Sequence, residues 1–187
     1  QRFSQLVITV DPRVALPVLD AAPDEQRWFS QVRDYPYATF ACSVEGLSRD
    51  APSVGYIDEN MVRARPGHPM AWVKRYADQD VFVFHLFAPT SLSDEQIEAR
   101  IAHDVARLGG RLTRVHHAVR WPFFPHFPPA FMQAGGLGEI AAWQGQRRTR
   151  LIGEALSFAA MARVAELAVR TARQLGSAGP TSRVNQS

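Results

Sequence analysis

The sequence contains very little cysteine and very little lysine. Cys42 is the single cysteine among the 187 residues, so neither a disulfide framework nor a metal site built on several thiolates is possible. This usage is compatible with a reducing compartment, and we expect a cytoplasmic protein. Lys74 is the only lysine among the 21 basic residues, so arginine supplies nearly all of the positive charge behind the net value of +3.

Long apolar runs and dense basic runs are also missing. No stretch approaches the roughly 20 apolar residues that a membrane-spanning helix needs, and no basic segment followed by an apolar one resembles a secretion signal. The arginines are scattered, and their one dense cluster lies at 147–150. A nucleic-acid-binding protein usually gathers its basic residues on one face or in one run. We therefore expect neither a membrane span nor a nucleic-acid partner.

Several catalytic signatures are absent as well. The Gly-x-Ser-x-Gly turn of many hydrolases does not occur, and no His-x-x-x-His spacing supports zinc. We therefore expect no metal site, and a hydrolase of that type is unsupported. A hydrophobic content of 46% and a charged content of 21% are ordinary for a globular protein. At this length the chain forms one domain or a domain and a half.

The first half of the chain is typical of short strands separated by turn residues. In the run 35–43, the side chains alternate between two faces, with Tyr37 on one and Phe40 on the other. The run 81–87 is apolar on both faces, which is typical of a strand in the middle of a covered sheet. We expect strands at 5–10, 35–43, 54–57, 70–77 and 81–87, the last two as a hairpin, and a helix beginning at Pro23.

A capped amphipathic helix is predicted next. Ser93 and Gln96 have the spacing of a capping box, in which each side chain accepts from the other residue's backbone. The glycines at 109–110 end the helix, and a strand is expected at 112–121. The helix should turn one apolar face to the sheet, formed by Ile97, Ile101, Val105 and Leu108.

Proline dominates the passage 122–129, Pro-Phe-Phe-Pro-His-Phe-Pro-Pro. Because proline lacks an N–H and fixes φ, this passage is predicted to be neither a regular helix nor a central strand. Its aromatic residues suit a pocket wall or a crossover between domains. The glycine-rich spot at 135–138 lacks the full G-x-G-x-x-G pattern, so we predict a flexible connection there.

The stretch 150–175 is predicted to be a short strand, a Gly153–Glu154 turn and one long helix. Glycine allows backbone to approach a ligand closely, and a helix start suits a phosphate. The Glu154 carboxylate could accept hydrogen bonds from hydroxyls, although an ordinary tight turn is the alternative. The helix is apolar over most of its circumference, so we expect it to be buried on several sides by more neighbours than a small domain offers.

Three stretches resemble the C-terminal part of FAD-dependent oxidoreductases of the flavin-containing amine oxidase type. They are LVITVDP at 6–12, WPFFPH at 121–126 and GEALSF at 153–158. The likeness runs from about residue 6 to residue 175, and it is closest to the branch of cyclopiazonate-type and related bacterial flavoproteins.

The resemblance implies an α+β fold with two parts. A mixed β-sheet substrate-binding domain with a covering helix would occupy 13–121. The FAD-binding, Rossmann-like domain would contribute an end strand at 1–12, and a return segment with its C-terminal strand and long helix at 122–175. Residues 176–187 would be a flexible tail.

The resemblance also implies roles for particular residues. FAD would contact residues of the Gly-Glu motif, and a small organic substrate would be oxidised by hydride transfer to the flavin. His126 and His85 are the acid–base candidates to test, because imidazole titrates near neutrality; the alternative is that both are structural. The implied cofactor-binding residues are Gly153, Glu154, Leu156, Ser157 and Phe158, and the implied substrate-pocket residues are Trp121 and Phe124.

The sequence departs from this family in two ways. The G-x-G-x-x-G half of the flavin domain is missing from it, so FAD binding would require that half or a partner chain that supplies it, or a homo-oligomer. The lysine that many members carry on the first substrate-domain strand is also absent from 35–43. The alternative interpretation is a non-enzymatic, flavoprotein-derived module that binds a partner or a small ligand.

Overall fold

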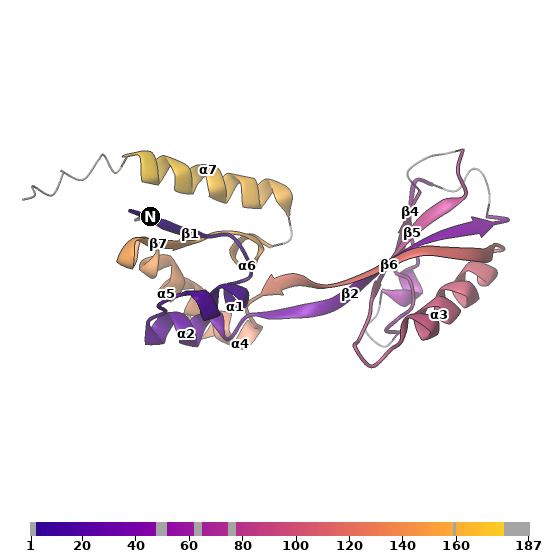
Figure 1. The fold of residues 1–187 in the computed structure, drawn as a ribbon, viewed down its shortest axis with the longest axis horizontal. Coiled ribbons are helices and arrows are strands. Elements are labelled where there is room, and N and C mark those ends of the chain that lie inside the picture. The colour runs from indigo at the N-terminus through magenta and orange to yellow at the C-terminus, as the bar shows by residue number, and fades with distance from the viewer. Residues whose placement is uncertain (1–2, 48–51, 62–64, 75–77, 159, 178–187) are drawn as a thin grey trace, which may run out of the picture. The chain divides into compact units, whose positions relative to one another are not determined.

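The computed structural model describes residues 3–47, 52–61, 65–74, 78–158 and 160–177. The chain divides into two compact units. Unit 1 combines 1–34 with 124–187, and unit 2 is 35–123. The sequence placed the corresponding boundaries after residues 12 and 121, so 13–34 fall in unit 1 rather than with the sheet of unit 2. Figure 1 shows the two units, whose mutual placement is not determined.

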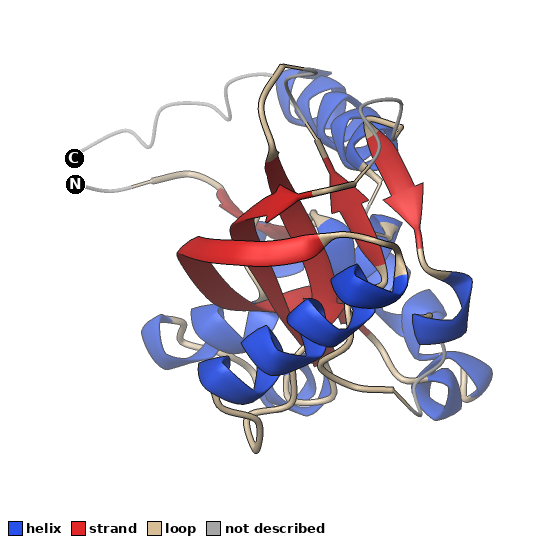
Figure 2. Cartoon of the chain, turned by 90° about the vertical axis from the view of Figure 1, so that its right-hand side faces the viewer, coloured by secondary structure: helices blue, strands red, loops and turns tan. Residues whose placement is uncertain are grey.

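Unit 2 is built on a five-stranded sheet with the strand order β3-β4-β5-β2-β6. Consecutive pairs from β3 to β2 are antiparallel. The strand β5 is central, as the run of apolar residues predicted. The strands twist relative to one another (Figure 2). Their bounds are β2 Arg33–Glu45, β3 Val54–Tyr56, β4 Ala71–Val73, β5 Val81–Phe87 and β6 Arg111–His126.

The helix α3 (Asp94–Arg107) packs on one face of this sheet, and the hydrophobic core of unit 2 lies between the two. The predicted capping box is confirmed, because the Gln96 N–H donates to Ser93 Oγ and the Ser93 N–H donates to Gln96 Oε1. Leu108 was predicted on the apolar face and is 45% exposed, because it caps the helix beyond its last turn. The core residues that β2, β5 and α3 contribute include Phe40, Cys42, Phe82, Phe84, Leu86, Ile97, Ile101 and Val105.

The strand β6 extends through the proline-rich passage to His126, beyond the predicted end at residue 121. β6 is an edge strand, so one side of its backbone has no partner strand. Pro122 and Pro125 are tolerated there because an N–H that is missing on this side interrupts no inter-strand hydrogen bond. The chain passes from unit 2 to unit 1 within this passage. The interpretation as a crossover between domains agrees with this finding.

Unit 1 contains a two-stranded parallel sheet, β1 with β7, surrounded by short helices. Its core brings together Trp28 and Phe29 from the first segment with Trp143 and Leu151 from the second. Its elements are β1 Leu6–Ile8, α1 Pro12–Ala15, α2 Pro23–Phe29, α4 Pro129–Gln133, α5 Gly136–Trp143, β7 Thr149–Leu151, α6 Glu154–Ser157 and α7 Met161–Ser177. Three-residue 3₁₀ helices lie at Leu16–Val18 and Gln146–Arg148 in unit 1, and another lies at Asp58–Asn60 in unit 2.

Two predictions for the C-terminal half are wrong. The glycine-rich spot is a helix start, because Gly135 takes a left-handed φ of 83° and Gly136 lies so close to the Phe131 ring that a Cβ would approach it to 2.3 Å. The predicted long helix is broken, because Phe158 leaves the helical region with a φ of 59°. The four-residue α6 precedes the break, and α7 begins at Met161.

Most of the surface of α7 is exposed within the described part of the chain, so these residues do not supply the several neighbours that were expected to bury it. Thr171 is its buried residue, whereas Met161 is 90% exposed and Val169 is 50% exposed. No helix in the described ranges is both long and apolar enough to cross a bilayer. Of the predicted flexible tail, residues 178–187 lie outside the described residues.

Replacing Phe84 by alanine tests the core of unit 2. The ring is fully buried between the sheet and α3, so its removal leaves a cavity and should lower the free energy of unfolding by about 3–5 kcal/mol. Urea unfolding followed by near-UV circular dichroism measures the change. The control Val119→Ala alters a side chain that is 40% exposed and should change stability by less than about 0.5 kcal/mol. Equal effects would contradict this placement of the core.

Candidate functional site

The predicted site residues fall into one group in each unit. Unit 1 holds the residues of the Gly-Glu turn together with Phe124 and His126, and unit 2 holds His85 and Trp121.

The turn after β7 lies where the carboxyl ends of two parallel strands meet. The pairing of β1 with β7 continues beyond both strands, since the Ile152 N–H donates to the Ile8 carbonyl over 2.9 Å. Gly153 follows with φ 113° and ψ −170°, a conformation that is nearly restricted to glycine. A Cβ there would lie 3.1 Å from the Thr9 carbonyl oxygen. The glycine is therefore required by backbone packing at a sheet edge where ligands bind in many α/β proteins.

The residues after Gly153 point in different directions. Glu154 is exposed, and its carboxylate has no hydrogen-bond or ion-pair partner among the described residues. Ser157 is buried and its hydroxyl donates to the Gly153 carbonyl over 2.8 Å, while Leu156 packs against the core. Of these three, Glu154 is the one whose functional group remains available to a ligand.

The predicted helix-dipole site at Glu154 is wrong in its physical basis. The helix that begins there has four residues, and the long helix starts only at Met161. A single turn sums few peptide dipoles, so it offers little of the positive field that a long helix start provides. A ligand at this turn would be held by backbone and by the carboxylate of Glu154.

Phe124, His126 and Phe158 form a contiguous aromatic group beside the same turn. The His126 ring stacks on Phe124 with centroids 5.3 Å apart, and Phe124 contacts Phe158 at 5.5 Å. Nδ1 of His126 donates to the Phe124 carbonyl over 2.8 Å, which fixes the orientation of the imidazole. Phe124 and Phe158 have φ values of 58° and 59°, both unusual for bulky residues. Such strained backbone often marks functional sites.

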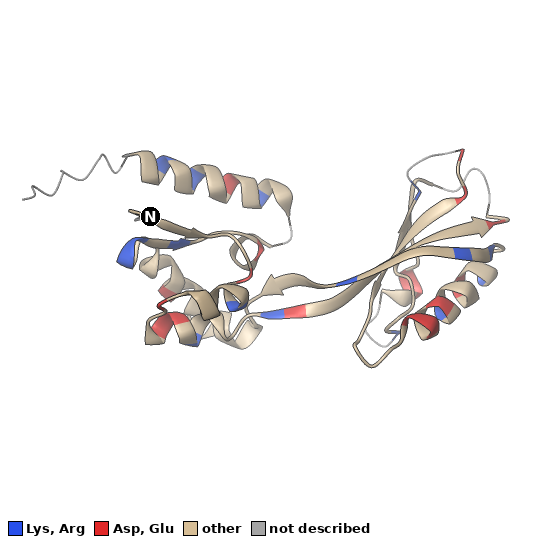
Figure 3. Ribbon diagram, in the orientation of Figure 1, with Lys and Arg blue, Asp and Glu red and all other residues tan. Residues whose placement is uncertain are grey.

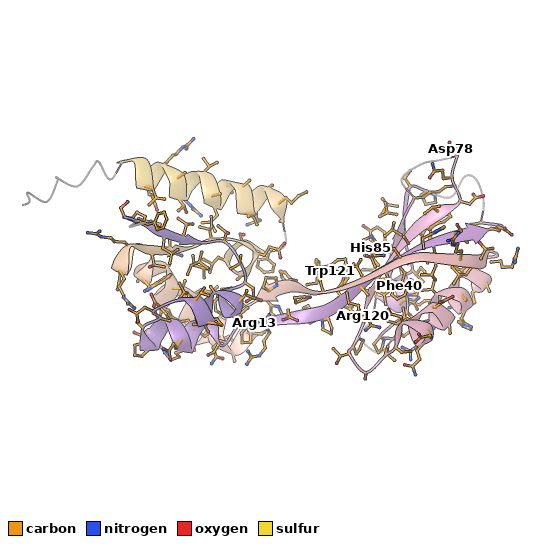
Figure 4. The ribbon with its side chains drawn as sticks, in the orientation of Figure 1. Arg13, Phe40, Asp78, His85, Arg120 and Trp121 are labelled. Atoms are coloured by element: carbon orange, nitrogen blue, oxygen red, sulfur yellow. The ribbon has the colours of Figure 1, made fainter. Side chains whose placement is uncertain are left out.

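His85 and Trp121 lie on the face of the unit 2 sheet opposite α3, grouped around Tyr37. Figure 4 labels both residues, together with Phe40 from the core face. The Tyr37 ring lies 4.6 Å from Phe123, 5.4 Å from Trp121 and 6.1 Å from His85. Alternation along β2 predicted that Tyr37 and Phe40 face opposite sides, but it gave no reason to select Tyr37 as the centre of a site.

Desolvation by these aromatic neighbours shifts two titratable groups. Burial lowers the pKa of His85 and raises the pKa of Tyr37, because each charged form loses solvation. Both side chains are therefore favoured in their neutral forms. This face can bind an apolar or aromatic molecule and offer it neutral hydrogen-bonding groups.

The described residues contain no group of three or more His, Cys, Asp or Glu side chains that could hold a metal ion. Lys74, the only lysine of the sequence, lies apart from the aromatic face. It is buried at the end of β4 with its Nζ 5.3 Å from the centre of the Phe82 ring, on the core side of the sheet.

Comparisons with known proteins agree with this architecture. No protein-family model matches the chain, and no curated protein matches it at the sequence level. Among solved structures, the CLA-producing fatty acid isomerase of P. acnes is 26% identical, with a TM-score of 0.79 over 91% of this chain. A protein described as a protoporphyrinogen oxidase, from Exiguobacterium sp. 255-15, is 15% identical with a TM-score of 0.58 over 91% of this chain.

The α+β fold is therefore shared with these two proteins. The chain spans 41% and 40% of their respective lengths, so it corresponds to less than half of either. At 15% identity the second comparison shows the fold alone.

Replacing Gly153 by alanine tests the turn. The new Cβ would lie close to the Thr9 carbonyl, and the alanine would have to adopt a positive φ. We therefore expect the free energy of unfolding of unit 1 to fall by about 1–3 kcal/mol. Urea unfolding monitored by tryptophan fluorescence measures the change. The control Gly138→Ala places a Cβ in open space in α5 and should not destabilise the chain. A neutral effect of Gly153→Ala would show that the turn relaxes freely.

The lowered pKa of His85 predicts a pH dependence of stability. Its native pKa lies below the ordinary value of 6.5, so the unfolded chain binds more protons between those two values. The native state should therefore lose stability as the pH falls below 6.5. His85→Phe keeps an aromatic ring and removes the titration, so the variant should lose less stability than the wild type over this interval. Parallel stability curves from urea unfolding across pH would contradict the prediction.

Proposed function

We propose that this chain is the C-terminal portion, or a subunit, of an FAD-dependent oxidoreductase. The observation that carries the proposal is the Gly153–Glu154 turn at the carboxyl ends of β1 and β7. The turn combines close backbone packing with the Glu154 carboxylate, which has no partner among the described residues. The fold shared with a fatty acid isomerase and an oxidase supports it, as does the family resemblance of the 6–12, 121–126 and 153–158 stretches.

The residues at the turn fit a flavin nucleotide. Hydroxyl groups of a ribityl or ribose chain are donors, and an exposed carboxylate such as that of Glu154 accepts from them. Gly153 lets the turn pack against the Thr9 carbonyl, because a Cβ would lie 3.1 Å from that oxygen. Phe158, which is 67% exposed, and Phe124 offer aromatic surface beside it. Leu156 and Ser157, also expected to contact FAD, support the turn from within.

In this proposal the chain orients the reactants. When bound, FAD would accept a hydride from a small organic substrate. His85 and His126 are the acid–base candidates, and each has a fixed environment: His85 is desolvated among aromatic rings, and His126 is tied to the Phe124 carbonyl. Trp121 and its neighbours on the aromatic face would exclude water from an apolar substrate. Lys74, the only lysine of the sequence, lies on the core side of the sheet, so it does not supply the lysine that many amine oxidases carry near the flavin.

A complete flavin site requires more polypeptide. A sheet of only two strands leaves one hydrogen-bonding edge of each strand without a partner strand among the described residues. Beside it, α7 borders an open cavity of about 630 Å³ lined by Arg150, Arg163 and Arg170. Figure 3 shows the basic bands along α7. We infer that a dinucleotide-binding portion, from the same protein or a partner chain, packs against these elements.

A non-enzymatic module is the second candidate. The exposed residues of α7, Met161 and Val169 among them, favour it because they form a surface for a partner whether or not a flavin is present. In that case the protein would bind no flavin. The absorption spectrum and native mass of the purified protein separate the two proposals. We propose a cytoplasmic location for either form, because the single cysteine, Cys42, is a free thiol.

Glu154→Gln tests the flavin proposal. In the protein assembled with its dinucleotide-binding portion, loss of the charged acceptor should weaken FAD binding by about tenfold to a hundredfold. Flavin fluorescence quenching during titration with FAD measures the affinity. The matched control Glu98→Gln removes an exposed carboxylate from α3 and should leave the affinity unchanged. Colourless protein that gains no flavin bands with that portion present would overturn the proposal.

A further inference from the structure

The cavity beside α7 is lined by three arginines and a single carboxylate. Its volume is about 630 Å³, and residues of α5, β7, α6 and α7 form it. Arg150 comes from β7, whereas Arg163 and Arg170 come from α7, as does the carboxylate of Glu166. The α7 residues in the wall recur at intervals of three and four, so they share one face of the helix. They are Arg163, Glu166, Leu167, Arg170, Thr171 and Gln174.

Other arginines of unit 1 take up the carboxylates that the unit contains. Arg13, Arg27 and Arg147 each form ion pairs with two carboxylates. Those pairs use every Asp and Glu of unit 1 except Glu154 and Glu166. Little negative charge therefore remains in unit 1 for the arginines of the cavity.

The three cavity arginines are not balanced within the chain. Among the residues that the structure describes, Arg150, Arg163 and Arg170 form no ion pair with a carboxylate. The parts of unit 1 outside the described ranges (1–2, 159 and 178–187) contain no Asp or Glu that could supply one. Arg150 is half-buried and donates to a neutral amide, Gln174 Oε1, over 3.1 Å. Like charges around one cavity repel each other, so an anionic occupant is favoured.

The spacing of the arginines favours an occupant with more than one anionic group. Arg163 and Arg170 are seven residues apart on α7, so their backbone positions lie about 10 Å apart along the helix axis. Arg150 reaches the C-terminal half of α7 through its contact with Gln174. Each end of the cavity can therefore bind a separate anionic group. Acidic side chains on an elongated segment of polypeptide supply two such groups, whereas a single phosphate supplies one.

Apolar side chains lie beside the arginines. Leu137 of α5, Leu156 of α6 and Leu167 of α7 line the cavity, and Leu137 is 38% exposed. Outside the cavity wall, Met161 and Val169 of α7 are exposed as well. Arginine beside exposed apolar surface is typical of surfaces that another polypeptide covers. The occupant should therefore carry apolar side chains next to its acidic ones.

We infer that this cavity binds an acidic, amphipathic segment of polypeptide. Its acidic side chains pair with the three arginines, and its apolar side chains contact the leucines of α5, α6 and α7. The origin of the segment in the dinucleotide-binding portion rests on the proposed function, whereas its chemistry rests on the cavity alone. This chain spans 41% and 40% of the two similar structures, so each of those proteins has further polypeptide available to pack on the corresponding surface.

Two matched peptides test the charge of the occupant. One is a leucine-containing peptide of about 15 residues, long enough to form a helix, with two glutamates seven positions apart. Its twin has glutamine at both positions. In a fluorescence anisotropy titration with the full chain at low salt, the glutamate peptide should bind about fivefold to tenfold more tightly. The preference should shrink as salt is added, because counter-ions screen exposed charges. Equal affinities, or no binding of either peptide, would overturn the inference.

Variants locate the binding surface. Combining Arg163→Gln with Arg170→Gln removes two charges from the cavity wall with little change in helix propensity, so the preference for the glutamate peptide should fall to about twofold or less. Arg173→Gln is the matched control, because Arg173 lies on the same helix but does not line the cavity. It should keep the wild-type preference. An unchanged preference in the double variant, or an equal loss in the control, would overturn the assignment to this cavity.

Inorganic pyrophosphate separates a polypeptide from a small anion as the occupant. It should bind more weakly than the glutamate peptide, because it makes no apolar contacts. Tighter binding of pyrophosphate would overturn the polypeptide assignment. Binding of the glutamate peptide by a chain whose assembled form takes up no FAD would overturn the flavin proposal and support the present one. FAD uptake without peptide binding would overturn the present one alone.

Discussion

The pairing of β1 with β7 is the constraint on which the architecture depends. It joins Leu6–Ile8 to Thr149–Leu151, elements at opposite ends of the chain, in parallel register. Because the two strands run in the same direction, all intervening residues must leave the sheet and return to its starting edge. The crossover contains the whole of unit 2, which is entered along β2 and left along β6. The same pairing brings Thr9 to Gly153, and so builds the turn that offers Glu154 to a ligand.

A buried carboxylate joins the two segments of unit 1 a second time. Glu25 is 4% exposed, accepts from the Trp143 indole over 3.1 Å and from Arg147 over 3.2 Å, and also caps its own helix through the Ala22 N–H. A buried charge is tolerated only when such donors surround it. Trp28 adds a hydrogen bond to Glu139 over 2.8 Å. Polar pairing therefore fixes which surfaces of the two segments meet, while the aromatic core supplies most of the stabilisation by burial.

Local patterns predicted the elements whose determinants are close in sequence. The capping box at Ser93, the alternation along β2 and the apolar run of β5 each depend on neighbouring residues, and all three are confirmed. The errors concern features that no sequence motif marked. Gly136 begins a helix where the Phe131 ring leaves no room for a Cβ, and the chain leaves α6 at Phe158, whose ring contacts that of Phe124. The roles of the site residues stay predictions, because they depend on a ligand and on the dinucleotide-binding portion that we propose.

The exposed surface of α7 is unusual for a helix of its composition. Its sequence has the broad apolar surface of a helix packed on several sides, yet within this chain it borders an arginine-lined cavity and a sheet of two strands. Unit 2 is different, because its five strands and α3 enclose an apolar core that is formed within one segment. The stability of unit 2 should therefore be intrinsic to this chain. The proposed flavin binding by unit 1 should instead depend on the polypeptide that we propose to cover β1, β7 and α7.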